Sequence, residues 1–136
     1  MSGHHVFLAE DNRGDILLVR QALSAHAVPY ELHVVRDGGE ALEFVARMGK
    51  PGAEPCPDII LLDLNLPKVD GPAVLMEFRK HPQCANTPVV VITSSDRPRD
   101  RELMSAFGVA YYFRKPSDLG EFMELGLVVS RLLKQA

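Results

Sequence analysis

Asp63 is a candidate for a reactive carboxylate, because it follows an apolar run and precedes a polar turn. Residues 59–62 read IILL, and residues 65–71 read NLPKVDG. A short apolar run bounded by turn residues predicts a buried strand, and a proline followed by a glycine predicts a tight turn. The strand would hold the carboxylate rigidly at a sheet edge, where it could act as a nucleophile or a metal ligand.

Other chemically active side chains also follow short apolar runs. They are Glu10, Asp11, Thr93 and Lys115. Carboxylates packed together raise one another's pKa values unless a cation joins them, and oxygen ligands that leave room for water suit Mg²⁺. If these groups meet, Asp63 is placed as an acceptor for a phosphoryl group, a reaction that needs mainly positioning and neutralised charge. Mg²⁺ would neutralise one side and the Lys115 ammonium the other, with the Thr93 hydroxyl donating to a phosphoryl oxygen.

The elements that must position these groups alternate between strands and helices. Apolar runs predict strands over 5–11, 30–37, 58–62, 87–95 and 110–116. Helical spacing is found in segments 15–23, 38–50, 71–81, 97–108 and 117–136. Asp15 is expected as a cap or first-turn acid, and Ser117 or Asp118 as the cap of the closing helix. The apolar stripe of that helix is expected from Leu119 through Leu133.

Five strand–helix units predict an α/β fold with a parallel sheet covered on both faces. Strands one, three and four are almost wholly apolar, as central parallel strands are, whereas strand two is mixed and belongs near an edge. Right-handed crossovers then favour a doubly wound, flavodoxin-like (βα)5 sheet of order 2-1-3-4-5. In such a sheet ligands bind outside the carboxyl ends of the strands, where the order reverses. That edge is where all the candidate residues would lie.

Composition is that of a single domain spanning 1–136. Its net charge of −3 argues against nucleic-acid binding. No segment has the roughly 20 apolar residues of a membrane helix, and the amino terminus does not read as a signal peptide. Cys56 and Cys84 make neither a disulfide framework nor a zinc spacing. We therefore expect a reduced, cytoplasmic setting.

Four motifs in this order resemble the receiver domain of response regulators. They are AED at 9–11, LLDLNLPKVDG at 61–71, VITSS at 91–95 and YFRKP at 112–116. The resemblance implies two-component signalling, in which a histidine kinase or a histidine phosphotransfer protein donates phosphohistidine and Mg²⁺ assists. Four segments are similar to single-domain receivers that partner bacterial phytochrome kinases: AEDNRGD at 9–15, DLNLPKVDG at 63–71, TSSD at 93–96 and the Pro-rich segment before residue 58.

The resemblance also assigns roles residue by residue. Asp63 would be the phosphoacceptor, and the metal shell would include Glu10, Asp11, Asp63 and the main-chain carbonyl of Asn65. Thr93 and Tyr112 would be switch residues and Lys115 the phosphate partner. Asn65 and Ser95 would tune dephosphorylation. Phosphorylation would change the surface of the fourth helix, fifth strand and fifth helix. Apart from the resemblance, Leu125, Val128 and Leu132 widen the apolar arc of the closing helix beyond its core stripe. They predict either single apolar residues at the surface or a homodimer built on these same elements.

Each residue alone has a simpler explanation. Asp63 could cap a helix, Thr93 could bond its own backbone in a turn, and Lys115 could lie on the surface. A haloacid dehalogenase-like phosphatase would use similar groups, but needs a second aspartate where this chain has Asn65. A flavodoxin-like flavin binder would need a phosphate cradle where this chain has EDNRGD. As a stand-alone receiver, the protein could be a direct effector, a relay intermediate or a phosphate sink.

Overall fold

The chain forms a parallel sheet that alternates with helices. In this computed structural model, residues 4–26, 30–48, 50, 55–94 and 97–134 are described. The elements are β1 (His4–Ala9), α1 (Arg13–Ala25), β2 (Tyr30–Val35), α2 (Gly38–Arg47), β3 (Ile59–Leu62), α3 (Gly71–Arg79), the 3₁₀ turn η1 (Pro82–Cys84), β4 (Val89–Thr93), α4 (Pro98–Ala106), β5 (Tyr111–Arg114), α5 (Leu119–Phe122) and α6 (Glu124–Lys134).

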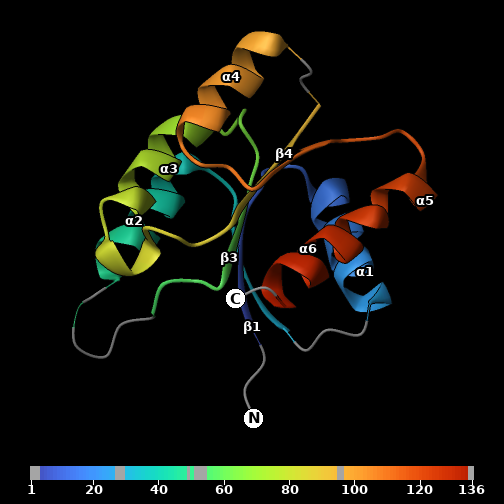
Figure 1. Cartoon of the computed structure of the whole chain (residues 1–136), viewed down its shortest axis with the longest axis horizontal. Coiled ribbons are helices and arrows are strands. Elements are labelled where there is room, and N and C mark those ends of the chain that lie inside the picture. The colour runs from blue at the N-terminus through green and yellow to red at the C-terminus, as the bar shows by residue number, and fades with distance from the viewer. Residues whose placement is uncertain (1–3, 27–29, 49, 51–54, 95–96, 135–136) are drawn as a thin grey trace.

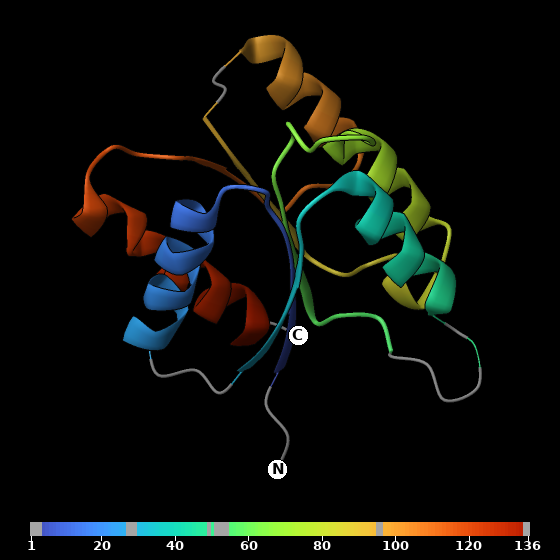
Figure 2. The ribbon, with the colours of Figure 1, turned by 180° about the vertical axis from the view of Figure 1, so that it is seen from behind.

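The strand order is β2-β1-β3-β4-β5, with every neighbouring pair parallel. This order confirms the predicted doubly wound fold. Figure 1 shows α2, α3 and α4 on one side of the sheet and α1, α5 and α6 on the other. The view from behind, in Figure 2, shows the same two layers. No helix among the described residues is long and apolar enough to cross a membrane.

Each face of the sheet carries its own core. Phe7, Phe44 and Phe78 pack together on the face of α2 and α3, with the Phe7 ring centroid 4.9 Å from that of Phe44 and 5.0 Å from that of Phe78. Phe113 and Phe122 meet edge to face at 5.7 Å on the face of α1 and α6. All residues of β3 and β4 are buried, whereas β2 is mostly half-buried. The central strands therefore form a rigid base, as the apolar runs predicted.

The amino terminus of α1 differs in detail from the sequence expectation. The Asn12 side chain accepts the hydrogen bond from the Asp15 main-chain N–H at 2.9 Å, so Asn12 is the cap and Asp15 is the first-turn acid. Leu17, which fits the helical apolar spacing, is 60% exposed. The buried face of α1 is instead formed by Val19, Ala22 and Leu23.

The closing segment is two helices rather than one. Helix α5 ends at Phe122 with Met123 as its C-cap, and the Gly126 N–H donates to the Met123 carbonyl at 3.1 Å, which marks a tighter turn between α5 and α6. The apolar stripe shifts as a result, because Leu119 is 57% exposed while Leu125 is fully buried. Asp118 is the cap of α5.

The expectation of two unlinked cysteines was wrong, because Cys56 and Cys84 form a disulfide in this structure. Cys56 precedes β3 and Cys84 lies in η1, which precedes β4. Since β3 and β4 are parallel neighbours, their entering loops meet at the same edge of the sheet, and the two Cα atoms are 5.8 Å apart. A separation of 28 residues along the chain concealed this proximity.

Reducing this disulfide should destabilise the protein. Opening a loop of 28 residues returns conformational entropy to the unfolded chain, which in the loop-closure estimate is worth about 3–4 kcal/mol. Urea unfolding with and without dithiothreitol measures this loss. Cys56→Ser is the matched control. It has no bond to reduce, so dithiothreitol should not change its unfolding curve. Superimposable wild-type curves in both buffers would show that the bond contributes nothing to stability.

Candidate functional site

Four strand ends supply the candidate site. Glu10 directly follows β1, Asp63 follows β3, Thr93 is the last residue of β4, and Lys115 follows β5. Because these strands are parallel neighbours, the four positions lie at the same edge of the sheet. The Lys115 main-chain N–H donates to the Thr93 carbonyl at 2.7 Å, which ties the last two strand ends together.

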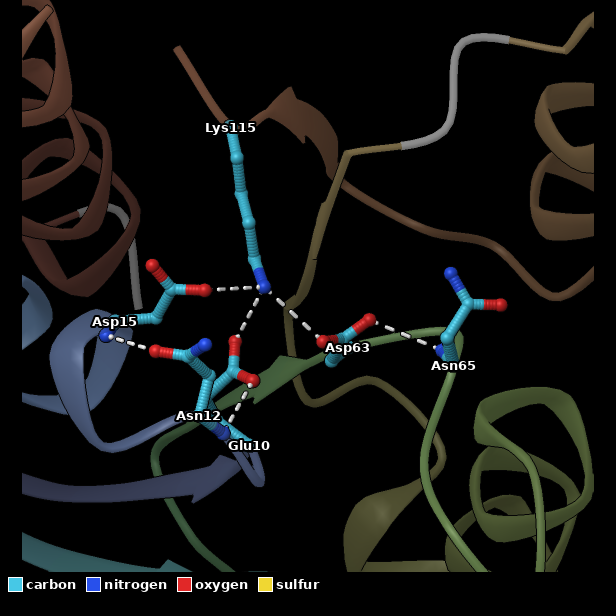
Figure 3. Close-up of polar contacts among 6 residues, drawn as sticks. All are labelled: Glu10, Asn12, Asp15, Asp63, Asn65 and Lys115. Atoms are coloured by element: carbon cyan, nitrogen blue, oxygen red, sulfur yellow. Dashed lines mark hydrogen bonds and ion pairs between the residues drawn. The ribbon is translucent and has the colours of Figure 1, made fainter. Parts of the chain in front are cut away.

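The Lys115 ammonium lies among three carboxylates. Its Nζ is 2.7 Å from Glu10 Oε1, 2.8 Å from Asp15 Oδ2 and 3.1 Å from Asp63 Oδ2. Figure 3 shows the lysine side chain extending from its strand end toward the three acids, which come from different elements. A residue near the carboxyl end of the chain thus forms ion pairs with three acids that belong to its first half.

Glu10, Asp11 and Asp63 form an acidic cluster beside this ammonium. One ligand oxygen from each can be chosen so that all lie within 4.8 Å of one another. Glu10 and Asp63 are buried, whereas Asp11 is exposed. The cluster therefore has buried oxygens at its base and an open side toward solvent, as a cation that keeps part of its water shell requires.

Without such a cation, the negative charges of this cluster are only partly balanced. Burial, reinforced by the nearby charge of Asp63, raises the pKa of Glu10 to about 7, although Lys115 opposes the shift. Burial alone would lower the pKa of Lys115, but its bonds to Asp15 and Glu10 and the charge of Asp63 outweigh burial and raise it. One ammonium therefore does not satisfy the acids fully, and the donor set fits a hard divalent ion.

Asp63 is held at both carboxylate oxygens. Its Oδ1 accepts the Asn65 main-chain N–H at 3.0 Å, and its Oδ2 faces Lys115. The Asn65 side chain is exposed and, in Figure 3, points away from Lys115. The Asp63 carboxylate is therefore oriented by a main-chain N–H and by the Lys115 charge rather than by a neighbouring side-chain amide.

Gly71 lets α3 start directly against the main chain of Asp63 and Leu64. A Cβ built on Gly71 would lie 2.7 Å from the Asp63 carbonyl oxygen and 2.9 Å from the Leu64 Cα. Its N–H donates to the Leu64 carbonyl at 3.1 Å. The glycine of the LLDLNLPKVDG motif is thus required by close backbone approach rather than by an unusual dihedral angle.

Tyr112 lies on the face of the sheet that α4 covers. Its ring is partly buried against the core of that face, and the Arg101 guanidinium of α4 lies 4.4 Å from the ring centroid. Thr93, at the end of the neighbouring strand β4, is fully buried. A cation–π contact therefore joins Tyr112 of β5 to Arg101 of α4, beside the strand that ends in Thr93.

The family model of the response regulator receiver domain matches residues 6–125. The chain belongs to this family. Receiver domains are phosphoacceptor modules of two-component signalling rather than enzymes, and the membership favours this class over the phosphatase and flavin-binding alternatives.

Similar proteins include phytochrome response regulators. Response regulator Rcp1 of Synechocystis sp. is 36% identical over 120 residues, which cover 88% of this chain and 82% of Rcp1. The structure of the phosphorylated cyanobacterial phytochrome response regulator RcpA has a TM-score of 0.87 at 36% identity, covering 99% of this chain and 97% of RcpA.

Solved receivers with metal ions are also similar. The receiver domain of the sensor histidine kinase PA1611 from Pseudomonas aeruginosa, with a magnesium ion coordinated in its active-site cleft, has a TM-score of 0.76 at 26% identity, covering 98% of this chain and 99% of that one. Rcp1 itself was solved in an Mn²⁺-bound form. Receivers similar to this one therefore bind divalent ions, and this receiver has the acidic cluster described above.

The sequence did not predict the role of Asp15 in this receiver. Asp15 was expected only as a cap or first-turn acid of α1, yet its carboxylate accepts a hydrogen bond from Lys115. The available signal was its place in the first turn of the helix that begins directly after the Glu10–Asp11 pair. Ser95, expected to tune dephosphorylation, lies outside the described residues.

Proposed function

We propose that this receiver accepts a phosphoryl group on Asp63 from the phosphohistidine of a histidine kinase or a histidine phosphotransfer protein. The observation that carries the proposal is the meeting of Asp63, Glu10 and Asp15 around the Lys115 ammonium at one sheet edge. An Asp63 carboxylate oxygen would bond to phosphorus as the phosphorus–nitrogen bond breaks, and the electron pair would return to the imidazole. The Lys115 ammonium would then pair with the phosphoryl oxygens.

Mg²⁺ would be held by Glu10, Asp11, Asp63 and the main-chain carbonyl of Asn65. When bound, it supplies positive charge to the phosphoryl oxygens. The support is the raised pKa of Glu10 together with the mutual proximity of the three acids. Asn65 and Ser95 would tune the hydrolysis of the phosphoryl group, since each lies two residues after a strand-end residue of the site.

Incubating the protein with acetyl phosphate, with and without Mg²⁺, tests the proposal. We expect intact mass to increase by one phosphoryl group only when Mg²⁺ is present. Peptide mapping should place that group on the segment containing Asp63. Labelling of another segment, or labelling that ignores Mg²⁺, would contradict the proposed site.

Thr93 and Tyr112 would report phosphorylation to the surface. The Thr93 hydroxyl at the end of β4 would move toward the phosphoryl group on Asp63. The Tyr112 ring on β5 would turn inward when the hydroxyl moves. The Arg101–Tyr112 contact would then transmit the change to α4. We expect the Tyr112 ring resonances to shift on phosphorylation, and Thr93→Val to reduce that shift although Asp63 is still labelled. A full shift in Thr93→Val would exclude the threonine from the switch.

The kinase would dock on α1. Leu17 is exposed and lines an apolar hollow of about 250 Å³ with Ile16, Arg13 and Arg36. Helix α1 begins just after Asp11, so a protein bound there would be close to the acceptor. The hollow therefore offers apolar area beside two cations, which suits a partner with an apolar surface and acidic groups.

Leu17→Asp should slow phosphotransfer from a cognate kinase by at least about tenfold, because it removes an apolar contact and places a carboxylate at the centre of the contact area. Labelling by acetyl phosphate should be unchanged. Met76→Asp on α3 is the matched control, since Met76 is 49% exposed and lies on another face of the sheet. Equal slowing in both variants, or in neither, would exclude α1 as the docking surface.

The partner we propose is a phytochrome kinase, because Rcp1 and RcpA are similar to this chain over most of their length. We also propose a single receiver domain over 1–136, acting alone in the cytoplasm, where a kinase has access to ATP. There the Cys56–Cys84 bond would form only under oxidising conditions. Phosphotransfer rates measured side by side with purified phytochrome kinases and with unrelated histidine kinases test the pairing, and faster transfer from an unrelated kinase would refute it.

A homodimer through α4, β5 and the closing helices is a further part of this proposal. Tyr111, Leu119 and Leu127 are exposed apolar residues of β5, α5 and α6. Burying them against a second copy would remove apolar area from water. Light scattering at several concentrations, with and without acetyl phosphate, measures the mass, and a monomer throughout would refute the dimer.

A further inference from the structure

A second cluster of metal-ligating side chains lies at the other end of the sheet. His5 and Glu31 are paired across β1 and β2, and His33 is two residues further along β2. Residues two apart share a face of a strand, so the three side chains lie on the same face. Phe7, the partner of His33 in the register, lies on this face and belongs to the core under α2 and α3.

The ligand atoms of this cluster are close together. His5 Nδ1 is 3.1 Å from His33 Nε2 and 3.7 Å from Glu31 Oε2, and one ligand atom from each residue lies within 4.8 Å of the others. Tetrahedral Zn²⁺ with bonds of about 2.0–2.1 Å places neighbouring ligand atoms about 3.3 Å apart. The His5–His33 and His5–Glu31 distances lie on either side of this value, and one ligand atom from each residue can be chosen with no pair beyond 4.8 Å, so side-chain rotations could bring all three onto one ion.

The two imidazoles are also held in orientation. The His5 and His33 rings stack with centroids 5.3 Å apart, and the His33 ring lies 6.1 Å from that of Phe44 in α2. The His5 main-chain N–H donates to Asp58 Oδ2 at 2.7 Å, which fixes the start of β1. Ligands carried by two paired strands lose little freedom on binding an ion, and this preorganisation favours affinity.

We propose that His5, Glu31 and His33 bind one Zn²⁺ ion, with water completing the shell. Two imidazole nitrogens and one carboxylate suit zinc and its neighbours Cu²⁺ and Ni²⁺, whereas Mg²⁺ prefers oxygen ligands alone. The site is therefore chemically separate from the cluster around Asp63. Because its ligands come from both strands, the bound ion joins the edge strand β2 to β1 and stabilises the folded protein.

The test is a Zn²⁺ titration of the whole protein by calorimetry, with Mg²⁺ in large excess to occupy the acidic cluster. We expect one equivalent of Zn²⁺ to bind and to raise the melting temperature. His33→Gln should weaken binding by at least about tenfold and remove the thermal shift, since it deletes a ligand. His81→Gln is the matched control, because His81 caps η1 and is not a member of this cluster, so the change should leave both results unaltered.

Two further measurements keep the test decisive if His33→Gln folds poorly. Glu31→Gln changes a mostly exposed side chain, so it should fold normally yet bind Zn²⁺ more weakly. With Cu²⁺ as the probe, electron paramagnetic resonance should show coupling to two imidazole nitrogens in wild type and to one in His33→Gln. Zn²⁺ affinity that Mg²⁺ abolishes, or that His33→Gln and Glu31→Gln leave unchanged, would overturn the site.

Discussion

We expect Asp63→Asn to abolish labelling of this receiver by acetyl phosphate and Mg²⁺. The amide that replaces the carboxylate has no anionic oxygen to attack phosphorus, and it also removes an oxygen from the acidic cluster. Asn has nearly the same shape as Asp, so the buried space that the side chain of residue 63 occupies directly after β3 should remain filled. Intact mass and phosphate-affinity electrophoresis should show the unmodified protein alone.

Asp70→Asn is the matched control for this substitution. Asp70 belongs to the same loop, where its side chain accepts the Ala73 N–H at the start of α3. Asn is an equally good cap, so labelling should proceed as in wild type. Mass gained by Asp63→Asn at the wild-type rate would move the acceptor to another residue, whereas loss of labelling in both variants would indicate a damaged loop.

The sequence predicted the fold because the strand signals were nearly free of competing explanations. Runs such as 59–62 and 89–93 are too short and too apolar for anything but central strands, and five repeats of one unit leave few topologies. The same rule predicted which residues would meet, since parallel strands bring their carboxyl ends to one edge. Glu10, Asp63, Thr93 and Lys115 could therefore be grouped from strand order alone.

Features that depend on contacts between different elements were not predictable in this way. Asp15 has ordinary first-turn chemistry in the sequence, and only the position of Lys115 a hundred residues later draws it into the site. Cys56 and Cys84 lie in separate loops, and their distance depends on how two strands enter the sheet. Helical spacing also could not decide which side of the closing segment is buried, because packing against α1 turns Leu125 inward.

Lys115→Gln should impair phosphorylation and also make stability strongly dependent on pH. The ammonium faces the position at which a phosphoryl group on Asp63 would lie. Removing an electrostatic group of this kind slows such reactions by roughly 10²–10³, so we expect a loss of that size in the rate of labelling by acetyl phosphate. Phosphate-affinity electrophoresis over time measures this rate.

The pH dependence follows from the carboxyls that the substitution leaves behind. A carboxyl whose pKa is raised in the folded state binds more protons there than in the unfolded chain, so stability falls as pH rises through that range. Glu10, with its pKa raised from 4.5 to about 7 by burial and by Asp63, is already in this position. The Lys115 ammonium lowers the pKa of Glu10, so its removal deepens the loss.

We therefore expect Lys115→Gln to lose more stability near about pH 8, where the loss should be about 3 kcal/mol, than near about pH 5, where Glu10 carries a proton. Asp15, which is partly exposed to water, keeps the loss at the lower end of the range for a broken buried ion pair. Mg²⁺ should restore more stability to the variant than to wild type, because it supplies the missing charge. Urea unfolding at both pH values, with and without Mg²⁺, measures each of these effects.

Lys80→Gln is the control for the loss of a lysine charge. Lys80 pairs with Glu77 on the surface of α3, and its side chain is 67% exposed, so its removal should change stability by less than about 1 kcal/mol at either pH. If Lys115→Gln behaved like this control, with the same small change at both pH values, the three carboxylates would not depend on the ammonium. The charge balance that we assign to the receiver site would then be wrong, even though the fold that positions it would stand.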